Sequence, residues 1–229
     1  MTPETSVIIP VRNGARFVGE AILSVRQQLG PDDEIIAVDD ASTDATTQVL
    51  AAIADPRLRL LHGAGCGVSA ARNLGLAAAR GEFVAFLDHD DLWPPARHHA
   101  LRDALLAQPA HGASFGKVRV RFEPGAPQTA DVRGMDGRHI WWLVGSGLFR
   151  RTITRDVGGF CEDMPVGEDG DFHLRLCEAG LEPLLCEAEG LVYRRHETNI
   201  TNDSEAVRRG LADLFRRKLA RQASRKPQP

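Results

Sequence analysis

A cluster of carboxylates is the feature of this sequence with the clearest chemical potential. An apolar run ends in Asp88, His89, Asp90 and Asp91, which places three carboxylates within four positions. The end of a strand does not need so much negative charge, so the cluster predicts a bound cation. Oxygen ligands on a short loop suit Mg²⁺ or Mn²⁺, which keep coordination positions for water and substrate phosphates. We therefore expect a substrate that carries a diphosphate.

Alternating strands and helices must position this cluster. Continuous apolar runs are typical of strands that are buried on both faces. They predict strands at residues 6–11, 34–38, 57–62 and 82–87, with helices at 15–28, 44–54 and 68–79. Such a pattern indicates a parallel sheet covered on both sides, in which ligands bind beyond the carboxyl ends of the strands. Pro10, Asp39, Asp40 and the carboxylate cluster all follow those ends.

The second half of the chain departs from this alternation. Pro94 and Pro95 suit a helix start, and the helix is expected to run to about residue 108. A strand is expected at residues 114–122, and residues 123–137, rich in Pro and Gly, are interpreted as a mobile loop. The polar, glycine-rich zone that follows, up to residue 171, is interpreted as the part of the domain that binds an acceptor.

Composition limits the class of protein. A chain of 229 residues with 43% hydrophobic residues allows one large α/β domain with a sizeable core. The net charge of −3 gives no electrostatic reason to bind nucleic acid. Four cysteines without a CxxC pair favour reduced thiols. No apolar run approaches the roughly 20 residues of a membrane-spanning helix, and no signal-peptide pattern begins the chain, so we expect a cytoplasmic protein.

Six short motifs follow one another along the chain. They read VIIPVRN at 7–13, VDDASTD at 38–44, GVSAARNLG at 67–75, GEFVAFLDHDD at 81–91, GGF at 158–160 and GEDGDF at 167–172. In this order they resemble the family 2 glycosyltransferases, and the resemblance extends from residue 6 to residue 196. It implies an α/β GT-A fold, with a Rossmann-like, mostly parallel central sheet flanked by helices. It also implies metal-dependent, inverting transfer of a sugar from a nucleotide-diphosphate sugar to an acceptor hydroxyl, and it does not identify the sugar.

The resemblance assigns the donor to the first half of the chain. Asp40 would accept the imino hydrogen of a pyrimidine base, with uracil favoured and thymine as the alternative. Arg72 would contact a phosphate or the base. The full nucleotide-sugar-binding set is Pro10, Arg12, Asp39, Asp40, Arg72, Asn73, Asp88, His89 and Arg195. The alternative for Asp39 and Asp40 is that they cap a loop, and for His89 that it is only a spacer between carboxylates.

The resemblance also assigns the metal and the base. Asp90 would be a direct ligand of Mn²⁺ or Mg²⁺, His196 a further ligand, and the ion would neutralise charge on the leaving diphosphate. Asp169 would be the general base that takes the proton of the acceptor hydroxyl. The alternatives are a solvated turn for Asp88 and Asp90, a polar strand end for His196, and a helix cap for Asp169.

Acceptor contacts and the C-terminal segment complete the prediction. Trp141, Trp142 and Glu168 are candidate acceptor-binding residues; one tryptophan is expected in the core and the other as a stacking surface for a sugar. Residues 203–226 hold eight basic and three acidic side chains, with apolar residues at helical spacing. This basic amphipathic helix either packs on the domain or contacts the inner face of a membrane that carries a lipid-linked acceptor.

We expect a GT-A domain at residues 1–202, divided into a nucleotide-binding half at 1–93 and an acceptor-side half at 94–202. The amphipathic helix at 203–222 and a disordered tail at 223–229 would follow. One rival function is a catalytically inactive nucleotide-sugar-binding subunit, against which the presence of both Asp90 and Asp169 argues. Another is a nucleotidyltransferase, whose glycine-rich, basic triphosphate loop is not matched by residues 10–14. The acceptor, a saccharide, lipid-linked glycan, small metabolite or peptide, is left open.

Overall fold

The computed structural model describes residues 4–128, 130–140 and 142–224. The strands are β1 (Thr5–Val11), β2 (Glu34–Asp39), β3 (Leu58–His62), β4 (Phe83–Phe86), β5 (Ala113–Phe122), β6 (Arg138–His139), β7 (Gly147–Arg150) and β8 (Leu184–Arg195). The α-helices are α1 (Val18–Arg26), α2 (Thr46–Ala51), α3 (Val68–Ala78), α4 (Arg97–Ala107), α5 (Ala130–Arg133), α6 (Arg151–Asp156), α7 (Glu168–Glu178) and α8 (Ser204–Ser224). Two 3₁₀ turns, η1 (Val144–Ser146) and η2 (Ile200–Asn202), complete the elements.

The strands form one mixed sheet in the order β3-β2-β1-β4-β7-β5-β6, with β8 also paired to β5. The first four strands are parallel, as predicted from their apolar runs. β7 is antiparallel to both β4 and β5, and β8 is parallel to β5. The sheet therefore continues through both halves of the chain, and its parallel part ends on one common edge, where Val11 of β1 is level with Asp39 of β2.

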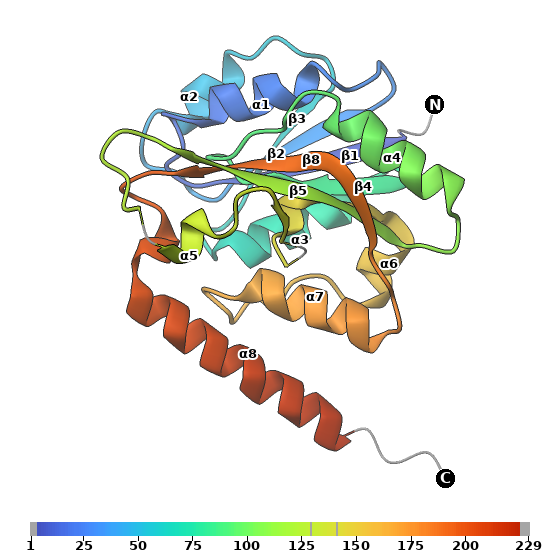
Figure 1. The fold of residues 1–229 in the computed structure, drawn as a ribbon. Helices are drawn as coiled ribbons and strands as arrows, with labels where there is room; N and C mark the ends of the chain where they lie inside the picture. Colours follow the sequence, from blue (N-terminus) through green and yellow to red (C-terminus); the bar gives the residue numbers. More distant parts are fainter. Residues whose placement is uncertain (1–3, 129, 141, 225–229) are drawn as a thin grey trace.

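Alternate side chains of the strands fill two separate cores. In β1, Val7, Ile9 and Val11 belong to one core and Ile8 to the other, as the period of two in a strand requires. Helices α1, α2 and α4 cover the first face, and α3, α6 and α7 cover the second (Figure 1). Both faces of the parallel strands are therefore apolar, and polar side chains collect at the carboxyl edge.

Helix α8 lies outside this layered body, against α7 (Figure 1). It ends at Ser224, two residues beyond the predicted boundary, so the predicted disordered tail begins too early; residues 225–229 lie outside the described residues. The predicted loop at 123–137 contains the four-residue helix α5. Within the described ranges, every helix is too short or too polar to span a bilayer.

Candidate active site

A cavity of about 1690 Å³ opens at the carboxyl edge of the parallel strands. Its lining combines Arg12, Asp40 and Asp90, from the loops after β1, β2 and β4, with Asp169 of α7 and His196 after β8. Residues far apart in the sequence thus share one space because their strands and helices end at the same edge. This arrangement is suited to a substrate that spans the edge of the sheet.

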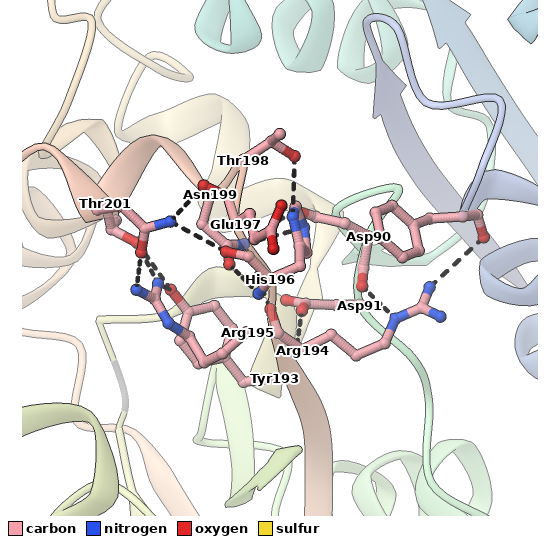
Figure 2. Close-up of polar contacts among 12 residues, drawn as sticks. Asp90, Asp91, Tyr193, Arg194, Arg195, His196, Glu197, Thr198, Asn199 and Thr201 are labelled. Atoms are coloured by element: carbon pink, nitrogen blue, oxygen red, sulfur yellow. Dashed lines mark hydrogen bonds and ion pairs between the residues drawn. The ribbon is translucent and has the colours of Figure 1, made fainter. Parts of the chain in front are cut away.

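The carboxylate loop meets the end of β8 at one side of the cavity (Figure 2). Asp90 Oδ2 lies 2.9 Å from Nε2 of His196 and accepts a hydrogen bond from Asn199 Nδ2 at 3.2 Å. Thr198 Oγ1 lies 2.9 Å from the other ring nitrogen of His196 and so orients the ring. Burial would raise the pKa of Asp90, but the hydrogen bond from His196 and the charge of His89 outweigh it and lower the pKa. Asp90 is therefore held as a carboxylate.

Arg194 fixes the backbone of the same loop. Its backbone N–H donates to Asp91 Oδ1 at 2.8 Å, and its guanidinium donates to the carbonyl of Asp90 (Figure 2). The guanidinium also donates to Glu20 of α1. Asp91 is buried, and burial together with the charges of Asp90 and Asp88 raises its pKa well above the usual range. Asp91 is consequently a structural group, while Asp90 presents its carboxylate to the cavity.

Arg72 connects the carboxylate loop with α7. Its side chain is buried, with one nitrogen 2.7 Å from Asp88 Oδ1 and another 2.9 Å from Glu168 Oε1 and 2.6 Å from Asp169 Oδ1. The guanidinium also lies over the ring of Phe160, 5.1 Å from its centroid. One cation therefore joins the expected donor side of the cavity to the expected base.

The carboxyl group of Asp169 is held at the first turn of α7. Gly167, with a φ of 94°, lets the chain turn sharply into the helix. Asp169 Oδ2 accepts a hydrogen bond of 3.2 Å from the backbone N–H of Val144. Burial raises the pKa of Asp169 to about 8, since the attraction of Arg72 is opposed by the negative charges of Glu168 and Asp88. Such a carboxyl has the basicity that a general base needs near neutral pH.

The donor set for a metal ion is small. Among the described residues, no group of three or more His, Cys, Asp and Glu side chains is arranged to hold a metal. Asp90 and His196 supply two adjacent donors that line the cavity. Mg²⁺-type sites often use one or two protein ligands and complete their coordination with water and substrate phosphates. The pair fits an ion of this kind.

The comparison with protein families agrees with this geometry. The family model "Glycosyl transferase family 2" matches residues 6–165, which include the strand-end loops and the carboxylate cluster. This chain belongs to glycosyl transferase family 2. The family match ends just before α7, so it covers Asp90 and Arg72 but not Asp169 or His196.

Two curated relatives are longer than this chain. The chain is 28% identical over 221 residues to the uncharacterized glycosyltransferase EpsJ of Bacillus subtilis (strain 168), covering 88% of this chain and 64% of EpsJ. It is 37% identical over 139 residues to the succinoglycan biosynthesis protein ExoO of Rhizobium meliloti (strain 1021), covering 60% of this chain and 36% of ExoO. The chain thus spans less than two thirds of either relative.

Solved structures share the fold. A crystal structure of S. aureus TarS 1-349 in complex with UDP-GlcNAc superposes with a TM-score of 0.66 and 22% identity, covering 87% of this chain and 61% of that chain. A further S. aureus TarS structure gives a TM-score of 0.66 and 20% identity, covering 83% of this chain and 36% of that chain. The GT-A fold expected from the motifs is therefore confirmed for this family 2 domain.

Most of the predicted donor residues line the cavity of the family 2 domain. They are Pro10, Arg12, Asp40, Arg72, Asp88, His89 and Arg195. The Asp40 carboxylate accepts backbone hydrogen bonds from residues 65, 66 and 67, at 2.8, 3.2 and 2.7 Å. The His89 ring packs on Gly14, where a Cβ atom would lie 2.4 Å from its Cδ2. His89 therefore supports the loop after β1.

Two predicted donor residues lie behind the cavity wall. Asp39 accepts hydrogen bonds from the Ser42 backbone N–H at 3.0 Å and from Thr47 Oγ1 at 2.6 Å. Asn73 Nδ2 donates to the carbonyl of Phe160 at 2.9 Å, and its Oδ1 accepts from the N–H of Phe160 at 2.8 Å. These contacts are those of positioning residues, and a nucleotide contact for either residue stays a prediction.

The candidate acceptor residues divide in a similar way. Trp142 lines the cavity and is 48% exposed, so it is available for stacking. Trp141 lies outside the described residues. Glu168 lines the cavity while it pairs with Arg72. Trp142 is therefore the exposed aromatic side chain among the described residues of the expected acceptor side.

Sequence reasoning missed the turn that follows His196. Arg195 is held by Tyr193 Oη at 3.0 Å and by Thr201 and Asn202, so this arginine anchors η2 beside Asp90 and His196 (Figure 2). The Asn199 side chain donates a hydrogen bond to Asp90 and accepts one of 2.6 Å from the backbone N–H of His196. The dense polar run at residues 196–202 was the available signal for this turn.

Proposed function

We propose that this chain is a metal-dependent, inverting glycosyltransferase that moves a sugar from a uridine diphosphate sugar to an acceptor hydroxyl. The observation that carries the proposal is that Asp90, Asp88, Arg72 and Asp169 line one cavity, in which Arg72 pairs with both Asp88 and Asp169. Membership of family 2 supports the reaction class, and the UDP-GlcNAc in the TarS complex supports the donor class.

Residues of the first half would hold the donor. Asp40 would accept the imino hydrogen of uracil with a free lone pair, because each carboxylate oxygen can accept more than one hydrogen bond. Asp90 and His196 would hold Mn²⁺ or Mg²⁺. Such an ion supplies Lewis-acid stabilisation of the charge that develops on the leaving diphosphate. Arg12, which lines the same cavity, would add positive charge near the phosphates.

Residues of the second half would prepare the acceptor. The acceptor hydroxyl would lie beside Asp169, which takes its proton as the oxygen attacks the anomeric carbon. Attack opposite the departing diphosphate is a single displacement, so the configuration at that carbon inverts. Arg72 and the N–H of Val144 hold the Asp169 carboxylate in place. The name of ExoO refers to succinoglycan biosynthesis, which supports a saccharide as acceptor.

Calorimetric titration with uridine, thymidine, guanosine and cytidine diphosphates, each with and without Mn²⁺, tests the donor half. We expect uridine diphosphate to bind tightly only with the metal. Asp90→Asn should weaken this Mn²⁺-dependent binding by about tenfold or more, the scale on which loss of one charged ligand contact acts. Asp103→Asn, a change at a carboxylate that is 64% exposed on α4, is the matched control.

Three results would contradict the proposal or a part of it. Failure of a folded sample to bind any of the four nucleotides would indicate that the motifs serve only as scaffold. Tight binding of uridine diphosphate without transfer to any acceptor in a product screen would favour an inactive binding subunit. Affinity for Mn²⁺ and nucleotide that Asp90→Asn leaves unchanged would move the metal away from the carboxylate loop.

A further inference from the structure

Helix α8 carries a row of large apolar side chains that the domain does not cover. Leu211, Phe215 and Leu219 are 48%, 60% and 64% exposed. They follow one another at intervals of four residues, so they form one continuous row along the helix. Burying such side chains is favourable, which makes this row the part of α8 that is prepared for a further contact.

The domain holds α8 by a different side. Gly210 packs against the backbone of Val166, and Leu214 packs against Gly170. Arg217 pairs with Asp163 at 2.8 Å, and Arg221 pairs with Glu178 at 2.8 Å. At 3.6 residues per turn, these attachment points lie roughly 100° to 160° around the helix from Phe215. The apolar row is therefore not needed to dock the helix on the domain.

Two cations flank the row without ion pairs. The nearby Arg209 and Arg216 are neutralised by Glu205 and Asp213 on the same helix. By contrast, no described carboxylate lies within 4 Å of Arg208 or Lys218, which stand three residues before Leu211 and three after Phe215. Apolar side chains between unpaired cations are the pattern that an anionic lipid surface recognises.

The row is continuous with the proposed reaction site. Arg208, Leu211, Phe215 and Lys218 line the same cavity as Asp169. The contact between Leu214 and Gly170 brings α8 to the residue next to this base. A molecule that extends from Asp169 over α8 therefore passes from polar groups to apolar side chains and cations.

We propose that the row of α8 docks on an anionic bilayer and that the cavity takes an acceptor anchored in that bilayer through a lipid phosphate. The docking stands on the helix itself, while the acceptor class rests on the proposed function. A second copy of the chain fits less well, because cations at both ends of the row would meet like charges in a symmetric pair. The side chains of Leu211, Phe215 and Leu219 offer a free saccharide no hydrogen-bonding groups.

Sedimentation with vesicles of phosphatidylcholine, alone or mixed with phosphatidylglycerol, tests the docking. The 229-residue chain should bind the mixed vesicles more tightly, and added salt should weaken the binding. Phe215→Gln combined with Leu219→Gln should weaken it by about tenfold or more, since two large apolar groups no longer enter the interface. Leu106→Gln combined with Leu185→Gln changes side chains of 49% and 51% exposure elsewhere and should bind as the wild type does.

A second double variant keeps the test decisive if the first one lowers the stability of the folded protein. Arg208→Gln combined with Lys218→Gln should remove most of the preference for phosphatidylglycerol. Equal binding by all variants, or no binding by the wild type, would overturn the docking. Light scattering that detects a dimer abolished by the Phe215 and Leu219 changes would assign the row to a second copy instead.

Nucleotide titration of the same samples separates this inference from the proposed function. Uridine diphosphate and Mn²⁺ should bind equally to the wild type and to a single Leu219→Gln variant, because Leu219 belongs to the row but does not line the cavity. Nucleotide binding without vesicle binding would refute the docking alone. Vesicle binding without nucleotide binding would refute the proposed function alone.

Discussion

Arg72 is a buried cation shared by three carboxylates. Its guanidinium reaches Asp88, Glu168 and Asp169 at 2.7, 2.9 and 2.6 Å. The cluster keeps an excess of negative charge, since one positive group faces three acidic ones. That excess, together with burial, gives Asp169 its raised pKa. The sequence motifs named these residues, but the ion pairs between them follow only from the folded chain.

Asp169→Asn should leave uridine diphosphate binding intact and lower the transfer rate by at least about a hundredfold, the scale of general-base removal. The amide keeps the shape of the side chain but cannot take a proton. Single-turnover transfer measured beside nucleotide titration separates the two effects. Asp103→Asn, at a carboxylate 64% exposed on α4, is the control. Full turnover by Asp169→Asn would remove this residue from the role of base.

The transfer rate should also depend on pH in a predictable direction. Only deprotonated Asp169 can accept the proton, and its pKa is about 8, so the rate should rise from pH 6, reach half its maximum near pH 8 and level off above about pH 9. Glu168→Gln removes a neighbouring negative charge and should move the midpoint to lower pH. The measurement is a pH–rate profile at saturating donor. A rate that is flat between pH 6 and 9 would contradict the raised pKa.

At the scale of elements, strand β8 and the carboxylate loop depend on each other. Arg194 is 1% exposed and joins the backbone carbonyl of Asp90 and the carboxylate of Asp91 to α1. These contacts link residues more than a hundred positions apart, at sequence separations of 103 and 104. The loop that carries Asp90 is therefore held by an element from the opposite end of the domain.

Arg194→Met should lower the free energy of unfolding by about 2–3 kcal/mol, because it leaves the partly buried carbonyl of Asp90 without its donor. Arg121→Met is the matched control, since Arg121 is the neighbour of Arg194 across β5 and β8 and its side chain is 50% exposed. It should change the free energy of unfolding by less than about 0.5 kcal/mol. Urea denaturation measures both variants, and equal effects would show that the network adds nothing.

The accuracy with which the sequence predicts these elements differs from one element to another, for physical reasons. The buried parallel strands have long apolar runs, so β1, β2, β3 and β4 were located to within a few residues. The four-residue strand β7 has no such run, and its antiparallel place between β4 and β5 depends on pairing with distant strands. Short motifs indicated Asp90 and Asp169, and the family resemblance indicated His196. The supporting Asn199 and Arg194 emerged only with the three-dimensional contacts.

At the scale of the whole molecule, the free energy of unfolding includes a pH-dependent contribution from one buried histidine. His98 of α4 is 1% exposed and its ring stacks on Trp93 at 5.7 Å. Burial, with the charge of Arg97, lowers the pKa of His98 to about 3, against an ordinary value of 6.5. Asp33 lies 3.9 Å away and does not reverse this effect. The folded protein therefore keeps this ring neutral.

The unfolded chain binds a proton at His98 below its ordinary pKa, whereas the folded chain does not. This contribution to stability is thus fully present above about pH 6.5 and is lost as the pH falls toward 3. Between pH 7 and 5 the loss should be about 2 kcal/mol. Urea denaturation of His98→Leu should show a pH dependence that is shallower by this amount. His99→Leu, at the exposed neighbour, should retain the dependence of the wild type.

The walls of the cavity come from different parts of the chain. Arg12, Asp40 and Asp90 come from loops at the ends of parallel strands, while Trp142 and the exposed row of α8 come from segments outside the first sheet strands. The second wall can change without disturbing either hydrophobic core, so in the proposed transferase a change of acceptor need not alter the donor site. Arg72 sets the limit of that freedom, because its pairs with Asp88 and Asp169 tie the two walls together.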